Sequence, residues 1–222
     1  MSRYKYGILL IAQLLLSFIS PLFSTFPFGR TIIDLGVTLV FVAAIYLISN
    51  TKKHLVIGIV LMLPTLIVTW GVKLVDIPHL EFAALLGSAL FFCYVCGLIL
   101  VDIFRAKMVT FNIIAAGVSV YLFFGNICGF IYAMIGLVDP NAFDIPEATA
   151  SYLGDSIANL NSAMYFSFVT LTTLGYGDIT PVNNFARSLA YLEAATGQFY
   201  LTILIASLVG VYVSSASNGG KS

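Results

Sequence analysis

The stretch FVTLTTLGYGDITPV, residues Phe168 to Val182, decides how this chain is interpreted. Two glycines flank a tyrosine, two threonines precede them, and an aspartate follows directly. Glycine has no Cβ and adopts positive φ angles at little cost, so Gly175 and Gly177 permit a backbone that is neither helix nor strand. Polar and permissive residues of this kind are unexpected in a chain that is otherwise strongly apolar. The surrounding sequence indicates where such a loop is needed.

The composition indicates an integral membrane protein. Of the 222 residues, 60% are hydrophobic and 9% are charged, too few charged groups to cover a soluble domain of this size. The net charge of zero argues against nucleic acid as a partner. Cys93 and Cys96 form a CxxC inside an apolar run, which favours a buried helix over a metal or redox site. His54 and His79 have no partners that would make a general base, so we expect no enzyme.

Apolar stretches predict an all-α membrane fold with six transmembrane helices. A helix needs about 20 mainly apolar residues to cross the hydrocarbon core. The first stretch could instead be a signal peptide, but it is long and no A-x-A cleavage site follows. Leu160–Leu174, between the fifth and sixth stretches, is apolar but too short to cross. The predicted spans are Tyr6–Phe23, Thr31–Ser49, Leu55–Val72, Phe82–Val101, Val109–Leu137 and Phe185–Ser214.

The positions of the charges predict that both termini are cytoplasmic, in a multi-pass protein of the cell (plasma) membrane. Lys and Arg are enriched on the cytoplasmic side of membrane proteins. That side would receive Arg3, Lys5, Lys52, Lys53, Arg105, Lys107 and Lys221, and the other side Arg30, Lys73 and Arg187. An acidic outer mouth would raise the local concentration of cations. The acids expected there are Asp76, Glu81, Asp139, Asp144, Glu147, Asp155 and Asp178.

The short apolar stretch and the loop after it predict a segment that enters the membrane and returns. Asn159 can cap a helix start, and the apolar pattern then continues to Leu171, enough for three helical turns. Non-helical backbone at membrane depth is tolerated only where protein or a water-filled cavity surrounds it. Alternating backbone conformations in TLGYGD can turn successive carbonyl oxygens to one side, where they replace the water shell of a cation. The negative end of the preceding helix would favour a cation there as well.

These residues resemble a known family of channels. TTLGYGD resembles the selectivity filter of tetrameric potassium channels, and YFSFVTLTTLGYGDITP is similar to the pore of prokaryotic ones. LEAATGQFYLTILIASLVGVY is similar to the inner helix that follows such pores. The resemblance covers roughly 109–214 and implies a homotetramer in the lipid bilayer, because each chain supplies one filter segment. It implies passive conduction of K⁺, with no cofactor besides the permeant ion.

The resemblance also assigns roles to residues of the filter. It implies that the Thr173 hydroxyl completes the innermost site, and that Gly177 and Asp178 end the filter at the outer mouth. Leu174 stands where the family more often has valine, and Tyr165 and Phe166 stand where it often has two tryptophans. The carbonyl oxygens implied to bind K⁺ are those of Thr173, Leu174, Gly175 and Tyr176.

The sixth span supplies further candidates. The resemblance places a gating hinge near Gly197, and close packing of this glycine against the pore helix is the alternative. Thr202 and Ala206 lie four residues apart, so they share a helix face and are candidates to line an inner cavity. Glu193 is expected to bond to groups behind the filter and not to face ions. After a modest rotation of the helix, the cavity would be lined by Ile203 or Ser207.

The spans before the pore resemble the layout of voltage-gated channels, but without their sensor. Voltage sensing needs arginines along the fourth span, since each charge moved through the field contributes about 2.3 kcal/mol per 100 mV. Here Arg105 and Lys107 lie at the inner end of the fourth span, and no arginine lies at its centre. The predicted domains are a four-helix domain (1–108), a pore domain (109–215) and a short cytoplasmic tail (216–222).

The leading hypothesis is a potassium-selective channel, and three alternatives remain. A weakly selective cation channel is possible because filter sequence does not fix filter geometry. A potassium transporter subunit would resemble four joined pore repeats, whereas this chain has one GYG. An accessory membrane protein would require the filter resemblance to be accidental. The sequence does not indicate what stimulus opens the pore.

Overall fold

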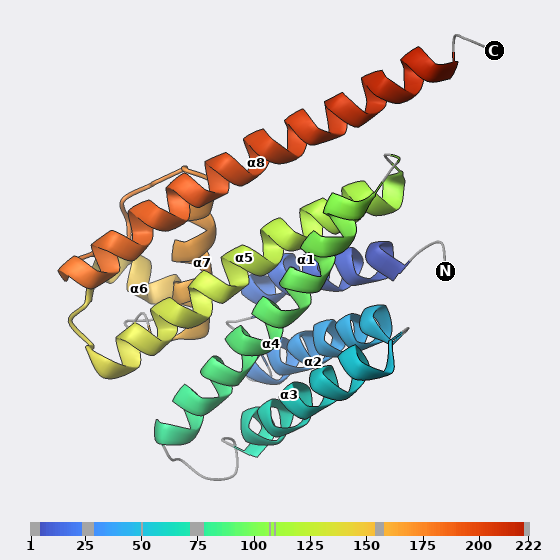
Figure 1. The fold of residues 1–222 in the computed structure, drawn as a ribbon. Helices are drawn as coiled ribbons and strands as arrows, with labels where there is room; N and C mark the ends of the chain where they lie inside the picture. The colour runs from blue at the N-terminus through green and yellow to red at the C-terminus, as the bar shows by residue number, and fades with distance from the viewer. Residues whose placement is uncertain are drawn as a thin grey trace.

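The computed structural model describes residues 5–23, 29–49, 51–71, 78–106, 108, 110–153 and 158–219. Helices dominate this part of the chain, in agreement with the predicted all-α class (Figure 1). Of the charged residues sorted above, Arg3, Lys73, Asp76, Lys107, Asp155 and Lys221 lie outside the described residues. The elements are α1 (Lys5–Phe23), α2 (Gly29–Ile48), α3 (Lys52–Gly71), α4 (Pro78–Arg105), α5 (Phe111–Val138), β1 (Phe143–Asp144), α6 (Glu147–Leu153), α7 (Leu160–Leu171), β2 (Thr180–Pro181) and α8 (Asn184–Gly219).

Helix α5 connects the two parts of the fold. It contacts α1 and α4 on one side and α7 and α8 on the other, and α8 runs alongside it in Figure 1. The four amino-terminal helices pack in sequence order, α1 on α2, α2 on α3 and α3 on α4. A chain of aromatic rings joins these helices to α5, since Phe92 contacts Phe41 of α2 and also Phe123 and Phe130 of α5. Through α1 and α4, the amino-terminal helices are therefore packed onto α5, which also contacts α7 and α8.

Within the described residues, four helices are long and apolar enough to cross a membrane: Lys52–Gly71, Leu80–Arg105, Phe111–Val138 and Asn184–Ser207. These correspond to the third to sixth predicted spans. The first two predicted spans are also helical, but the apolar stretches found there, Lys5–Ser17 and Asp34–Ile48, are shorter. A fold with six spans therefore stays a prediction.

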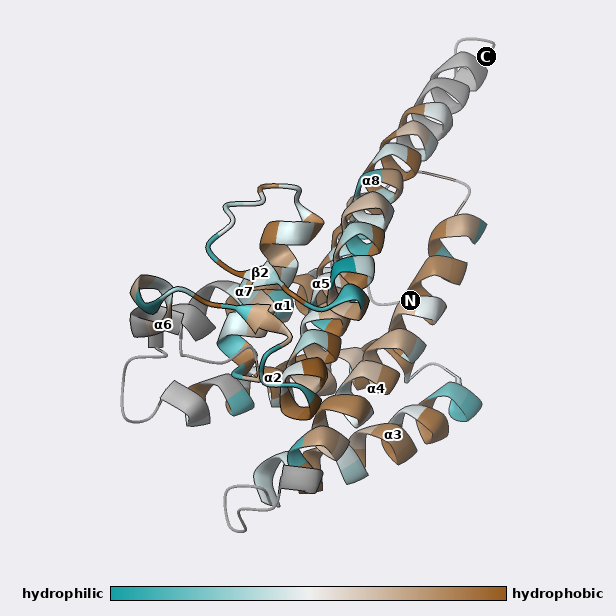
Figure 2. Ribbon diagram, turned by 90° about the vertical axis from the view of Figure 1, so that its left-hand side faces the viewer, coloured by the Kyte–Doolittle hydropathy of each residue, from teal (hydrophilic) through white to brown (hydrophobic). Residues whose placement is uncertain are grey.

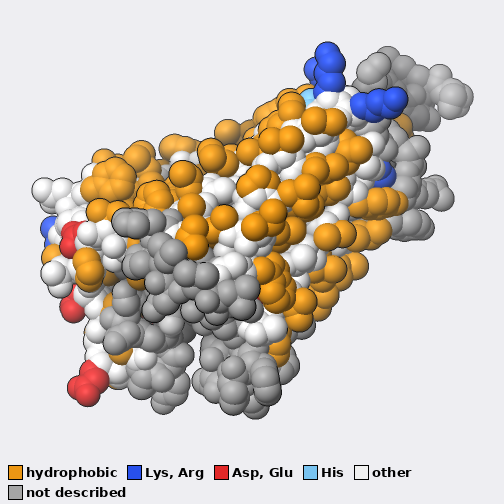
Figure 3. All heavy atoms as spheres, turned by 90° about the horizontal axis from the view of Figure 1, so that it is seen from below, with side chains coloured by type: hydrophobic (Ala, Val, Ile, Leu, Met, Phe, Trp, Pro, Cys, Tyr) orange, Lys and Arg blue, Asp and Glu red, His pale blue; other side chains and the backbone are white. Residues whose placement is uncertain are grey.

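On the face seen in Figure 3, hydrophobic side chains cover the middle of the molecule, and charge gathers at its ends. In Figure 3, Asp and Glu side chains lie at one end and most Lys and Arg side chains at the opposite end. Figure 2 shows hydrophobic residues along α3, α4 and α5 and hydrophilic residues in the loops around β2. This distribution is typical of a protein whose middle lies in hydrocarbon and whose ends lie in water.

A small hairpin fixes the loops at the acidic end. Strand β1 follows α5 and pairs antiparallel with β2, which precedes α8. Asn183 donates a side-chain hydrogen bond of 2.9 Å to Asp139, the carboxy-terminal cap of α5. The main-chain N–H of Val182 donates to the oxygen of Ala142 at 2.8 Å. The end of the loop between α7 and α8 is thereby held at the level where α5 ends and α8 begins. Neither the hairpin nor α6 is predicted by the sequence.

Glycines on α5 let the neighbouring helices approach closely. A Cβ placed on Gly117 would come within 2.9 Å of Leu204 in α8, and one on Gly129 within 2.5 Å of Met164 in α7. A Cβ on Gly125 would come within 2.7 Å of Phe168. Small residues at helix contacts are typical of membrane proteins, where close packing replaces the hydrophobic effect as the driving force between helices.

Candidate functional site: the loop between α7 and α8

Helix α7 carries the chain from the acidic end to the level of the middle of α5, where the loop begins. Its amino-terminal cap is Asn159, whose side chain accepts a hydrogen bond of 3.0 Å from the N–H of Asn161, as the sequence predicts. Its 12 residues span about 18 Å at 1.5 Å per residue, well short of a bilayer core of about 30 Å. At its other end, the carbonyl oxygen of Leu171 accepts a hydrogen bond of 3.2 Å from the hydroxyl of Tyr121 in the middle of α5.

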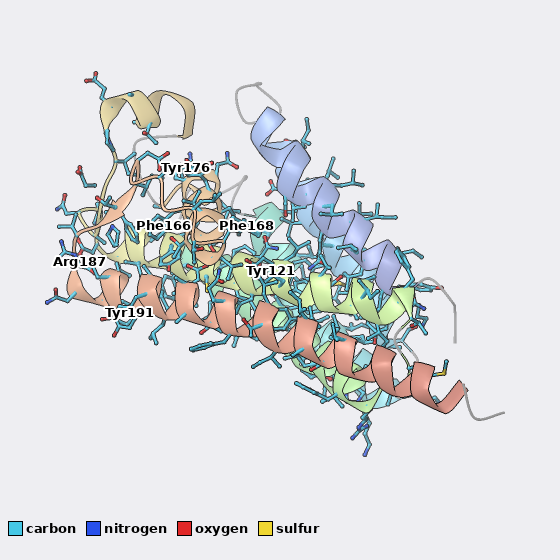
Figure 4. All side chains as sticks on the ribbon, turned by 90° about the horizontal axis from the view of Figure 1, so that it is seen from above. Tyr121, Phe166, Phe168, Tyr176, Arg187 and Tyr191 are labelled. Carbon is cyan, nitrogen blue, oxygen red and sulfur yellow. The ribbon has the colours of Figure 1, made fainter. Side chains whose placement is uncertain are left out.

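The loop then returns to the end from which α7 started. Leu171 also lies against Gly197 of α8. At a rise of 1.5 Å per residue, Gly197 is about 20 Å along the helix axis from Asn184, where α8 begins. By residue 180 the chain is back at the hairpin beside the first turn of α8. In Figure 4, Tyr176 lies on this returning loop, beyond Phe166 and Phe168 of α7. The chain therefore runs from the acidic end to the level of the middle of α5 as a short helix, and it returns to the acidic end as a non-helical loop.

The backbone of the loop alternates between conformations. Thr173, Gly175 and Gly177 have φ angles of 60°, 57° and 77°, whereas no positive φ occurs at the residues between them. The sequence predicts this freedom at the two glycines but not at Thr173, a β-branched residue for which a positive φ is uncommon. Such a conformation costs on the order of 1–3 kcal/mol and persists only where the surroundings fix it.

Main-chain hydrogen bonds to α7 fix that conformation. The N–H of Thr173 donates to the oxygen of Thr170 at 2.9 Å, and the N–H groups of Leu174 and Gly175 both donate to the oxygen of Val169, at 3.0 and 3.3 Å. The donors of the loop therefore point back toward the helix. In the described part of the chain, no donor is bonded to the main-chain oxygens of residues 173–176. These residues are exposed in the single chain, with Tyr176 at 66% and Leu174 at 58%.

Aromatic side chains of α7 support the outer part of the loop. The hydroxyl of Tyr165 donates to the carboxylate of Asp178. Phe166 packs edge-on against Tyr132 of α5 and Phe143 of β1. The bond from Tyr165 to Asp178 is not predicted by the sequence.

Glu193 of α8 lies behind the loop, as expected, and joins three helices. Its side chain is 1% exposed, accepts a 2.6 Å hydrogen bond from the hydroxyl of Tyr132 in α5, and lies 2.5 Å from the hydroxyl oxygen of Ser167 in α7. Ser167 is also 2.7 Å from the carbonyl oxygen of Gly125. A hydroxyl has one proton to donate. Both contacts of Ser167 are hydrogen bonds at the same time only when the carboxyl group of Glu193 donates a proton to Ser167.

A neutral Glu193 also fits its surroundings. Its hydrogen-bond partners in the described part of the chain are the hydroxyl groups of Tyr132 and Ser167 and the thiol of Cys128, and none of these is a cation. An ionised carboxylate without a cation is costly to bury. The hydrogen bonds from Glu193 to Ser167 and from Ser167 to Gly125 therefore both form when the acid is protonated. Together they connect α8 to α7 and α7 to α5.

Gly197 packs tightly against the end of α7. A Cβ on this residue would lie 2.6 Å from both the Cδ1 atom and the carbonyl oxygen of Leu171, closer than real contacts allow. Helix α8 continues without interruption from Asn184 to Gly219 through this position. The contact agrees with the packing alternative, and the hinge stays a prediction.

The cavity candidates lie on an exposed face of α8. Thr202 and Ala206 are both exposed in the single chain, and the hydroxyl of Thr202 donates to the main-chain oxygen of Gln198 at 2.8 Å. Gln198 belongs to the same face, and its side-chain nitrogen lies 3.4 Å from the hydroxyl oxygen of Thr173. Gln198 is not among the residues predicted from the sequence, although its four-residue spacing from Thr202 is the signal that identifies it.

Comparison with known proteins agrees with this geometry. Residues 142–214 match the family model described as ion channel. The match indicates an ion channel domain. It begins at the hairpin and includes α7, the loop and most of α8. No curated protein matches the chain. Among the described residues, no group of three or more His, Cys, Asp or Glu side chains could hold a metal ion.

Proposed function

We propose that four copies of this chain form a potassium-selective channel in the cell membrane. The observation that carries the proposal is the backbone of residues 173–177. Positive φ angles at alternate residues, with the N–H groups bound back to α7, leave a run of carbonyl oxygens that no donor of the described chain occupies. Carbonyl oxygens in such a row can replace the hydration shell of a monovalent cation.

Four chains are needed because one loop cannot surround an ion. A ring of four loops would bring together the main-chain oxygens of Thr173, Leu174, Gly175 and Tyr176, with the Thr173 hydroxyl at the innermost site. Gly177 and Asp178 would then lie at the outer mouth. The negative end of α7 would point at the ion path and favour a cation below the filter. Conduction is passive, since ions at neighbouring sites repel one another forward.

The charged ends of the molecule support an orientation in the membrane. Lys52, Lys53 and Arg105 lie on exposed positions at the ends of α3 and α4, whereas Asp144 and Glu147 lie exposed by the hairpin. Basic residues favour the cytoplasmic side. The loop would then open toward the outside, with both termini in the cytoplasm. The acidic outer mouth would attract cations to it.

Gly175→Ala is the direct test of this site. Gly175 has a φ of 57°, which an alanine adopts only with strain, so the row of carbonyl oxygens should be disrupted. We expect the K⁺ current of the purified protein in planar bilayers to be abolished, while Gly210→Ala, which has nothing within 4 Å of an added Cβ, keeps it. An unchanged current in Gly175→Ala would mean that the ion path lies elsewhere.

A further inference from the structure

One face of α8 leads from the predicted cavity up to the filter loop. Gln198, Thr202 and Ala206 are spaced four residues apart, so they lie above one another on the helix. All three are exposed in the single chain. Since the hydroxyl proton of Thr202 is donated to the main chain of α8, Gln198 is the side chain on this face whose polar groups extend furthest toward the loop.

The packing of Gly197 explains why the next side chain reaches the loop. The close contact of Gly197 with the carbonyl oxygen and side chain of Leu171 brings α8 against the last turn of α7. Thr173 begins the row of carbonyl oxygens two residues after Leu171. The long side chain of Gln198, the residue after Gly197, therefore brings its amide to Thr173.

The hydrogen bonds at Thr173 leave the amide of Gln198 available to an ion. The hydroxyl of Thr173 donates to the oxygen of Thr172 at 2.7 Å, so its lone pairs face the side-chain nitrogen of Gln198 at 3.4 Å. This distance is at the long end for an N–H···O bond, so the contact is weak and readily exchanged. The amide oxygen of Gln198 accepts no hydrogen bond from the described part of the chain.

We propose that Gln198 is a specificity-determining residue whose amide oxygen supplies a neutral ligand for monovalent cations at the inner entrance of the filter. The inference rests on the proposed channel function. A side-chain amide oxygen is chemically close to the main-chain carbonyl oxygens of the filter. Its contact with Thr173 orients the amide, and a cation arriving from the cavity meets this oxygen before the innermost site.

Block by Ba²⁺ applied from the cavity side tests the assignment, because Ba²⁺ has nearly the radius of K⁺ and a second charge. In Gln198→Glu, an added carboxylate should strengthen the block about tenfold or more, since charge at this level attracts a divalent cation. In Gln198→Met, a side chain of similar length without the amide should weaken the block about three- to tenfold and lower the single-channel current. Each variant is measured as the full chain in planar bilayers, after its oligomer is isolated by size exclusion.

Thr196→Val is the matched control. Thr196 lies at the same level of α8, two residues away and so on nearly the opposite face, and is also exposed in the single chain. The block of the Thr196→Val variant by Ba²⁺ should equal that of the unchanged protein. If Gln198→Glu does not assemble, the Met variant decides by itself.

Two other results would overturn the inference, and they are distinguishable. If the unchanged protein conducts K⁺ and its Ba²⁺ block is the same in both Gln198 variants, the assignment of Gln198 is wrong and the channel function stands. If the unchanged protein carries no K⁺ current, the proposed function fails and the role of Gln198 fails with it.

Discussion

Replacing Glu193 tests whether a neutral acid holds α7 in place. In Glu193→Gln, the amide nitrogen can donate to Ser167 and the amide oxygen can accept from Tyr132, so the contacts of 2.5 and 2.6 Å are preserved. We expect the free energy of unfolding to change by less than about 1 kcal/mol. If Glu193 were ionised, the same substitution would remove a charged acceptor and cost more, about 1.5–3 kcal/mol.

Glu193→Ala removes the network altogether. The hydroxyl of Tyr132, which is fully buried, would lose its acceptor at a cost of about 1–3 kcal/mol. The void left by the carboxyl-bearing side chain adds about 2–3 kcal/mol, at the lower end of large-to-small substitutions. The sum is about 3–6 kcal/mol per chain. At about 2–4 °C per kcal/mol for a chain of this size, the melting temperature should fall by on the order of 10 °C.

The assay is thermal unfolding of the purified oligomer in detergent, followed by size exclusion. Glu147→Gln is the control, because Glu147 is exposed at the start of α6 and its loss of charge should leave the melting temperature unchanged. A Gln variant as unstable as the Ala variant would refute the neutral acid. An Ala variant as stable as the unchanged protein would refute the network itself.

Three further substitutions test separate contacts. Gly197→Ala places a methyl group 2.6 Å from the last carbonyl oxygen of α7 and should lower the melting temperature by about 5 °C, whereas Gly210→Ala should not. Tyr165→Phe loses its bond to the Asp178 carboxylate, so under the proposed function the K⁺ current should decay faster than in the exposed control Tyr191→Phe; equal decay would contradict this role. Arg105→Gln should leave the slope of conductance against voltage nearly unchanged. A large decrease in this slope would show that α4 senses voltage.

Hydropathy is sufficient to predict the long helices of this fold. Long apolar runs such as Val109–Leu137 leave few alternatives in a membrane, and the observed α5, Phe111–Val138, agrees within two residues. The glycines of the loop are equally informative, because their freedom at positive φ is a local property. The helix ends and the short α6 are less predictable, since they depend on the loops at the acidic end.

The sequence does not predict which residues far apart in the chain contact one another. Glu193 is predicted to lie behind the filter, but its partners Tyr132 and Ser167 come from two other helices whose facing sides the apolar pattern does not distinguish. The positive φ of Thr173 is likewise imposed by hydrogen bonds to α7 and not by its own preference. Local rules therefore predict the loop, whereas tertiary packing determines what holds it.

The central claim is potassium selectivity, and the reversal potential tests it most directly. The purified 222-residue chain is placed in planar bilayers with K⁺ on one side and Na⁺ on the other, at equal concentration. A row of carbonyl oxygens selective for K⁺ predicts a reversal potential displaced far toward the K⁺ equilibrium potential. A reversal potential near zero, with equal permeability to the two ions, would contradict the claim and leave a weakly selective cation channel.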